Sequence, residues 1–183
     1  MRSNKKVLVI VGIVIVVALC FLAFFTAKKI STPKSYVWKT VSVDYIGTFS
    51  DGTMFDTNIQ DVAQKNGLYA AGRSYVPLMF TVGSGQVVAG FDKAIDGMKI
   101  GETKKITIEP KDAYGEYDKT KVTSIDKSIF DDAKVTPVSW QTYQMWGQLI
   151  KVLGVSDKKV DIDANHPMAG KTLNFEITLK AVK

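Results

Sequence analysis

Cysteine and histidine are almost missing from this sequence of 183 residues, which has one of each, Cys20 and His166. Cys20 lies in a long apolar run near the N-terminus, so the remainder of the chain has no thiol. Disulfide bonds, thiol catalysis and Cys/His zinc sites are therefore excluded from that remainder. We expect neither a metal ion nor a cofactor.

A nucleic-acid-binding pattern is also lacking. The formal charge is +6, but part of it comes from lysines that flank the apolar run, and no basic stretch alternates with aromatic residues. A nucleic acid partner is therefore not expected.

The apolar run covers residues 7–25, which are 19 consecutive residues without a charge. At 1.5 Å per residue a helix of this length measures about 28 Å, close to the thickness of the bilayer's hydrocarbon core. A cleaved signal peptide would have a shorter apolar region and a small-residue cleavage site, and a lipoprotein site at Cys20 would need a small residue where Leu19 stands. We therefore predict a single-pass transmembrane helix and membrane localisation.

The flanks of this run set the expected organisation. Residues 1–6 form a short basic tail, whose retention in the cytoplasm would place the soluble part outside the cell. Residues 26–36 are polar and basic with one proline, which is typical of a linker.

Beyond the linker, apolar and polar residues alternate in several stretches, as in half-buried strands. Val41, Val43 and Tyr45 begin the pattern, and the clearest stretch is 173–180. A single amphipathic stretch, "AGFDKAIDGM" at 89–98, has its apolar residues at helical spacing. The fold class predicted is α+β, with an antiparallel sheet packed on one short helix.

Two stretches interrupt this pattern. Residues 57–75 lose the alternation and are interpreted as a structured excursion, with a helical turn near Asp61. Residues 120–163 suggest one short helix and several strands between two core-like segments. We predict that 120–163 is a small domain inserted into a main domain made of 37–119 and 164–183.

The stretches "VSVDYIGTFSDGTMFDTN", "FTVGSGQVVAGFDKAIDGMKIGETKKITIEPKDAYGE" and "NHPMAGKTLNFEITL" resemble the FKBP family of peptidyl-prolyl cis-trans isomerases. The segment 120–163 lies where SlyD-like members carry their insert-in-flap domain, and the apolar anchor is similar to that of longer archaeal members. The resemblance implies a half-wrapped antiparallel sheet around one helix, with an apolar pocket between them.

Site residues follow from this resemblance. It implies catalytic roles for Asp56, Tyr114, Phe91 and Phe175. Substrate-binding positions would be Tyr45, Phe55, Leu78, Phe80, Val87, Val88, His166 and Met168. A chaperone-like surface on the insert would use Phe130, Trp140, Tyr143, Met145 and Trp146.

Simpler interpretations stand beside these roles. Phe80, Phe91 and Phe175 could be core residues, Asp56 could cap a turn, and Tyr114 could be a loop residue. His166 could serve packing alone. About half of the insert's apolar residues are expected in its own core, and the others would form an exposed patch.

The function expected is isomerisation of X-Pro bonds in unfolded or newly translocated polypeptides, which would be the partners of the protein. The insert would capture unfolded chains. The alternative is a non-catalytic, membrane-anchored chaperone or peptide-binding module on the same fold.

Overall fold

The computed structural model describes residues 35–183. The helix predicted over 7–25 and most of the predicted linker lie outside the described residues. Within 35–183, none of the helices has both the length and the apolar character needed to cross a membrane.

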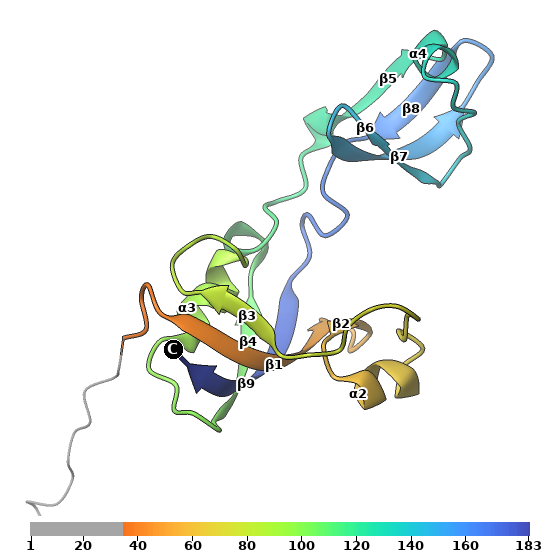
Figure 1. Ribbon diagram of the computed structural model, residues 1–183. Coiled ribbons are helices and arrows are strands. Elements are labelled where there is room, and N and C mark those ends of the chain that lie inside the picture. Colours follow the sequence, from red (N-terminus) through yellow and green to blue (C-terminus); the bar gives the residue numbers. More distant parts are fainter. Residues whose placement is uncertain (1–34) are drawn as a thin grey trace, which may run out of the picture. The chain divides into compact units, whose positions relative to one another are not determined.

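The first sheet has five antiparallel strands (Figure 1). The order is β2-β1-β9-β4, and β3 pairs with the same edge of β1 as β2 does, farther toward the start of β1. The strands are β1 (Thr40–Phe49), β2 (Met54–Thr57), β3 (Leu78–Thr81), β4 (Thr103–Ile108) and β9 (Leu173–Val182). Antiparallel sheets and few helices agree with the predicted fold class.

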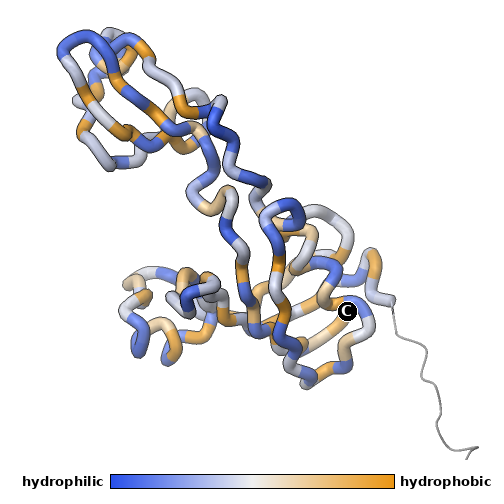
Figure 2. The backbone as a smooth tube through the Cα atoms, turned by 180° about the vertical axis from the view of Figure 1, so that it is seen from behind, coloured by the Kyte–Doolittle hydropathy of each residue, from blue (hydrophilic) through white to orange (hydrophobic). Residues whose placement is uncertain are grey.

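Alternation along these strands places one set of side chains in the core. Val43 on β1 and Ile177 and Leu179 on β9 are completely buried, whereas the residues between them are partly exposed. Figure 2 shows the alternation as hydrophobic and hydrophilic colours along the backbone. The two ten-residue strands pair along almost their whole length, so they form the centre of the sheet.

Helix α3 (Ala89–Ile95) packs on the buried face of this sheet through Phe91, Ala94 and Ile95. Gly90 permits close packing on β4, because a Cβ atom there would collide with the Ile108 side chain. The helix ends at Ile95, earlier than the apolar spacing predicted, but Met98 beyond its end is still buried.

Short helical segments occupy the connections. They are α2 (Gln60–Lys65), α4 (Ser128–Asp132) and the 3-10 turns η1 (Pro110–Asp112) and η2 (Lys119–Lys121). Helix α2 contains Asp61, where the sequence predicted a helical turn, and it ends at Lys65 with Asn66 as its C-cap residue.

A second sheet lies within the segment predicted to be the insert. Its order is β5-β8-β7-β6, and all neighbours are antiparallel. The strands are β5 (Val122–Asp126), β6 (Thr142–Met145), β7 (Gln148–Val155) and β8 (Lys159–Asp163). This sheet has a separate core with α4, composed of Phe130, Ile150, Val152, Val160 and Ile162.

Candidate functional site

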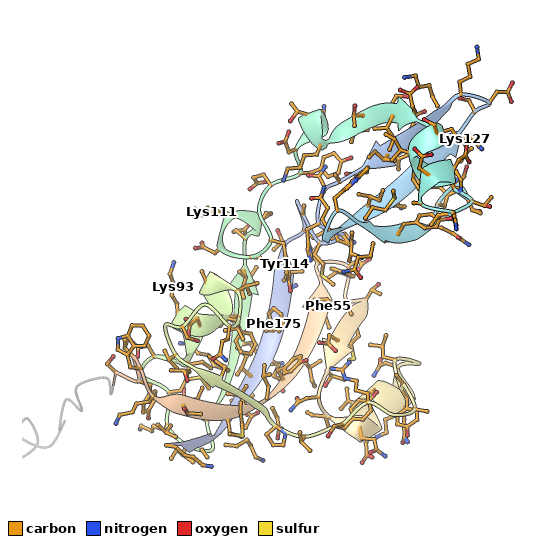
Figure 3. All side chains as sticks on the ribbon, turned by 45° about the horizontal axis from the view of Figure 1, so that its top comes forward. Phe55, Lys93, Lys111, Tyr114, Lys127 and Phe175 are labelled. Atoms are coloured by element: carbon orange, nitrogen blue, oxygen red, sulfur yellow. The ribbon has the colours of Figure 1, made fainter. Side chains whose placement is uncertain are left out.

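A cavity of about 220 Å³ lies between α3 and the first sheet. Its lining is mainly apolar and comes from four strands or their flanks, the start of α3 and the segment after η1. The lining residues are Tyr45, Phe55, Asp56, Leu78, Gln86, Val87, Val88, Phe91, Tyr114 and Phe175. Figure 3 labels three of them, Phe55 on β2, Phe175 on β9 and Tyr114.

Aromatic rings form the apolar wall of this cavity. Phe91 lies edge to face with Phe175, Phe80 and Tyr45, at ring-centroid distances of 5.1, 5.9 and 6.1 Å. Phe55 meets Phe175 at 5.5 Å with perpendicular planes. Such edge-to-face pairs add about 0.5–1.5 kcal/mol each beyond the burial of their surface, so the wall is stiff.

Gly47 on β1 is required for the packing of two of these rings. A Cβ atom at this position would lie 2.7 Å from the Phe55 ring and 3.0 Å from the Phe175 ring. Both rings therefore lie across the backbone of β1, where any side chain would displace them.

Asp56 is held by three groups at the polar side of the cavity. The Tyr45 hydroxyl donates to Asp56 Oδ2 at 2.6 Å, Arg73 Nη1 lies 2.7 Å from Oδ1, and the Thr57 N–H donates to the same Oδ1 at 2.9 Å. Arg73 Nη2 also donates to the Tyr45 hydroxyl at 3.4 Å. Because both oxygens of Asp56 are engaged, its carboxylate has a fixed orientation beside the aromatic wall.

The environment shifts the titration of two members of this group. Burial raises the pKa of Tyr45 well above its ordinary value, and the hydrogen bond to Asp56 raises it further. The hydrogen bond to Asp56 also raises the pKa of Arg73. Tyr45 therefore remains a neutral donor to Asp56 at physiological pH.

Two hydrogen-bond donors in the cavity remain available for a ligand. Within 35–183, neither the Val88 N–H nor the Tyr114 hydroxyl has a hydrogen-bond partner. The Val88 carbonyl accepts from the Phe91 and Asp92 N–H groups at the start of α3, which fixes the Val88 peptide unit. These two groups can donate hydrogen bonds to carbonyl oxygens of a bound polypeptide.

Tyr114 is stacked on His166, with ring centroids 4.0 Å apart and planes 2° from parallel. His166 Nδ1 accepts the Met168 N–H at 3.1 Å, and the Gly170 N–H donates to the Gly115 carbonyl at 2.8 Å. His166 thus supports the back of a cavity residue, whereas neither His166 nor Met168 lines the cavity itself.

Most of the predicted pocket residues line the cavity, but not all of them do. Tyr45, Phe55, Asp56, Leu78, Val87, Val88, Phe91, Tyr114 and Phe175 all line the same cavity. Phe80 does not, because it is only 3% exposed and packs in the core against Phe91; its substrate-binding role stays a prediction.

Arg73 and Gln86 were missed by the sequence interpretation. Arg73 lies in the irregular segment between α2 and β3, where no periodicity indicates its position. One signal was available, since Arg73 is the only arginine after Arg2 in a chain rich in lysine. A guanidinium is the side chain best suited to a fixed pairing with a carboxylate.

The segment 120–163 exposes some of its predicted surface residues and buries others. Trp140 and Trp146 are 69% and 61% exposed, and Tyr143 and Met145 are half-buried against the core of the second sheet. Phe130 is fully buried, so its predicted place on the surface is wrong; its ring fills the space between α4 and the sheet. Among residues 35–183, no three metal-ligating side chains cluster.

A family model and a well-covered relative both identify the family to which this chain is similar. Residues 32–180 match the family model described as FKBP-type peptidyl-prolyl cis-trans isomerase. The chain is 39% identical over 143 residues to the short-type peptidyl-prolyl cis-trans isomerase of Methanocaldococcus jannaschii, with 78% of this chain and 90% of that protein covered.

Two further relatives are more distant. The FKBP-type peptidyl-prolyl cis-trans isomerase SlyD of Aeromonas hydrophila is 28% identical over 145 residues, or 78% of this chain. FK506-binding protein 2 of Yarrowia lipolytica is 37% identical over 106 residues, or 56% of this chain. The matches span 62% and 65% of those two proteins.

Proposed function

The chain belongs to the FKBP-type peptidyl-prolyl cis-trans isomerases, and we propose that the cavity between α3 and the first sheet is where it rotates X-Pro bonds. The observation that carries this proposal is the combination of a wall of Phe55, Phe91 and Phe175 with two donors, the Val88 N–H and the Tyr114 hydroxyl, that have no partner among the described residues 35–183. The substrates are proline-containing polypeptides.

Desolvation is the main source of rate acceleration in this proposal. Amide resonance gives rotation about the prolyl bond a barrier of about 18–20 kcal/mol, and water stabilises the polar planar form. In a cavity walled by phenylalanine rings this stabilisation is lost, whereas the twisted transition state, which is less polar, loses less. The barrier is lowered without a covalent step.

The polar groups orient the bound peptide. The Val88 N–H and the Tyr114 hydroxyl bind substrate carbonyls on the two sides of the twisting bond. Asp56, held by Tyr45 and Arg73, supplies a fixed negative charge beside the amide. Positioning by these groups requires no nucleophile and no proton transfer.

We also propose that the insert captures unfolded chains before they reach the cavity. Support comes from Trp140, Trp146 and Leu149, which are exposed although the insert has a closed core of its own. Exposed apolar side chains of this size are typical of protein-binding surfaces. A captured chain is retained near the cavity, which raises the local concentration of its prolines.

Membrane attachment completes the proposal. We propose that residues 7–25 form a single-pass anchor and that residues 37–183 lie outside the cell. Support comes from the uncharged length of 7–25 and the short basic tail before it. Protease added to intact cells should digest the domain; protection until the membrane is opened would reverse this orientation.

The test of the two proposed roles compares a short proline peptide with a protein whose refolding is limited by proline isomerisation. The full-length chain should accelerate both the isomerisation of the peptide and the refolding of the substrate protein. Replacing 120–163 with a short loop should leave the peptide rate nearly unchanged and slow the refolding reaction about tenfold or more, since millimolar local concentration is lost. Equal losses on both substrates, with the main domain folded, would show that the insert supports the cavity and captures nothing.

A further inference from the structure

Three large apolar side chains are exposed near the point where the described chain begins. Val37 is 50% exposed, Trp38 72% and Ile100 63%. They contrast with Tyr36, which is 5% exposed and whose hydroxyl donates to the Met98 carbonyl at 2.8 Å. We call Val37, Trp38 and Ile100 the basal patch.

Strand register places the whole basal patch at one end of the first sheet. The Trp38 N–H donates to the Val82 carbonyl, just beyond β3, and the Gly101 N–H donates to the Leu179 carbonyl near the end of β9. In the order β3-β1-β9 these points are two strands apart, which corresponds to about 10 Å. Figure 1 shows the start of β1, the turn before β4 and the C-terminus at this same end.

The cavity lies toward the other end of the sheet. Gly47, over which Phe55 and Phe175 pack, pairs with Phe175 near the start of β9, and the insert is connected after β4 and before β9. Phe175 lies four residues before Leu179 on β9, which corresponds to about 13 Å. The basal patch is therefore about four residues along the strand from the cavity.

Trp38 lies in a turn and presents its ring to the outside. Its φ is +63°, and the Lys39 N–H donates to the Tyr36 carbonyl at 2.8 Å, which closes a turn over Val37 and Trp38. The indole is 72% exposed. Tryptophan is the side chain most enriched where proteins meet the headgroup region of a bilayer.

The charged groups around the patch suit the same environment. Lys39, Lys99 and Lys183 are exposed, and none of them takes part in an ion pair among residues 35–183. The nearby carboxylates of Asp96 and Glu102 accept the N–H groups of Tyr36 and Lys99. Long lysine side chains can extend their ammonium groups to the headgroups while their stems lie on apolar surface.

The length of the tether decides which surface the patch can reach. Nine residues, 26–34, separate the apolar run from the described domain. A chain of this length extends to at most about 30 Å and as a flexible coil spans roughly 17 Å. The basal patch, beginning three residues later, is therefore within reach of the bilayer surface from which the anchor emerges.

From the basal patch and this tether we propose that Val37, Trp38 and Ile100 insert into the bilayer interface and hold the domain upright on the membrane. The cavity and the insert are then kept away from the lipid, and open to chains in the surrounding solution. This inference rests on the proposed membrane anchor.

The test uses the full-length chain in lipid nanodiscs, with Trp140→Phe and Trp146→Phe so that Trp38 is the only tryptophan. Lipids brominated in the upper part of their acyl chains should shift the Trp38 emission to the blue and quench most of it. A matched chain that keeps only Trp140, with Trp38→Phe and Trp146→Phe, should show no quenching. Ile100→Asn, an exposed substitution, should reduce the quenching of Trp38.

Three results would overturn the inference and are distinguishable from one another. If the chain does not enter the discs, the anchor itself fails, and the docking falls with it. If the chain enters but Trp38 is quenched no more than Trp140, the anchor stands and the docking is wrong. If the blue shift depends on protein concentration and not on lipid, the patch is covered by a second copy of the chain.

Discussion

Arg73 offers a sharp test of the cavity, because only the structure connects it with Asp56. Arg73→Met keeps most of the side chain's apolar stem and removes the guanidinium that lies 2.7 Å from Asp56 Oδ1. The two side chains are 40% and 35% exposed, so solvent screens their attraction. Partly exposed ion pairs of this kind contribute about 0.2–1 kcal/mol.

The loss of the ion-pair energy raises the activation free energy of isomerisation by the same amount when Asp56 must keep its orientation in the transition state. Since about 1.4 kcal/mol is a factor of ten, the range corresponds to a loss of roughly 1.4- to 5-fold in kcat/KM. We expect a loss within this range for Arg73→Met in a peptide isomerisation assay, and a smaller difference from wild type at high salt.

The control for this prediction is Lys65→Met at the end of α2. Lys65 is exposed and has no ion-pair partner among residues 35–183, so its loss removes one positive charge without affecting Asp56. A double-mutant cycle of Arg73→Met with Asp56→Asn should give a coupling energy of about 0.2–1 kcal/mol. The reasoning is refuted if Arg73→Met behaves like Lys65→Met, or if the two substitutions are simply additive.

Three further predictions concern stability and the support of the cavity. Phe91→Leu breaks three edge-to-face contacts and should lower the free energy of unfolding by about 1–3 kcal/mol in urea titrations; a loss below this range would mean that the ring wall is not stiff. The raised pKa of Tyr45 contributes stability that is complete below about pH 10, the value of an unperturbed tyrosine, and is lost as the pH rises further. The difference in unfolding free energy between wild type and Tyr45→Phe should therefore shrink above about pH 10. A difference that stays constant would contradict the raised pKa of Tyr45. His166→Ala should raise KM more than it lowers kcat, because Tyr114 loses the ring it stacks on, and His166→Phe should restore the wild-type value; equal effects of both substitutions would show that a flat ring is not what matters.

The parts of the fold that the sequence predicted are those with strong periodicity. Residues 173–180 alternate without interruption, and β9 (Leu173–Val182) is one of the two long central strands. The helix at 89–98 was recognisable from its apolar spacing, but its end was not, because Asp96 is already extended (ψ 131°) and Gly97 follows at φ +78°, while Met98 stays buried. Periodicity thus identifies an element but does not define its ends.

The cavity was predictable only through the family resemblance. Apolar periodicity marks Phe80, Phe91 and Phe175 alike as buried, and it cannot say that Phe80 lies behind Phe91 whereas Phe175 lines the cavity. Arg73 could not be found this way, since a loop without periodicity brings it to Asp56. In the segment 120–163, Phe130 and Trp140 are both large aromatic residues, and only the packing of α4, which carries Phe130, on the second sheet distinguishes the buried ring from the exposed one.

The most direct test of the account is NMR exchange spectroscopy on an X-Pro peptide, which measures cis-trans interconversion at equilibrium. Catalytic amounts of the protein should produce exchange on a timescale much shorter than the tens of seconds of the uncatalysed reaction. Asp56→Ala and Tyr114→Ala, both folded by circular dichroism, should each slow this exchange, whereas Lys65→Met should not. Exchange that is as fast in both cavity variants as in wild type would contradict the assignment of isomerisation to this cavity.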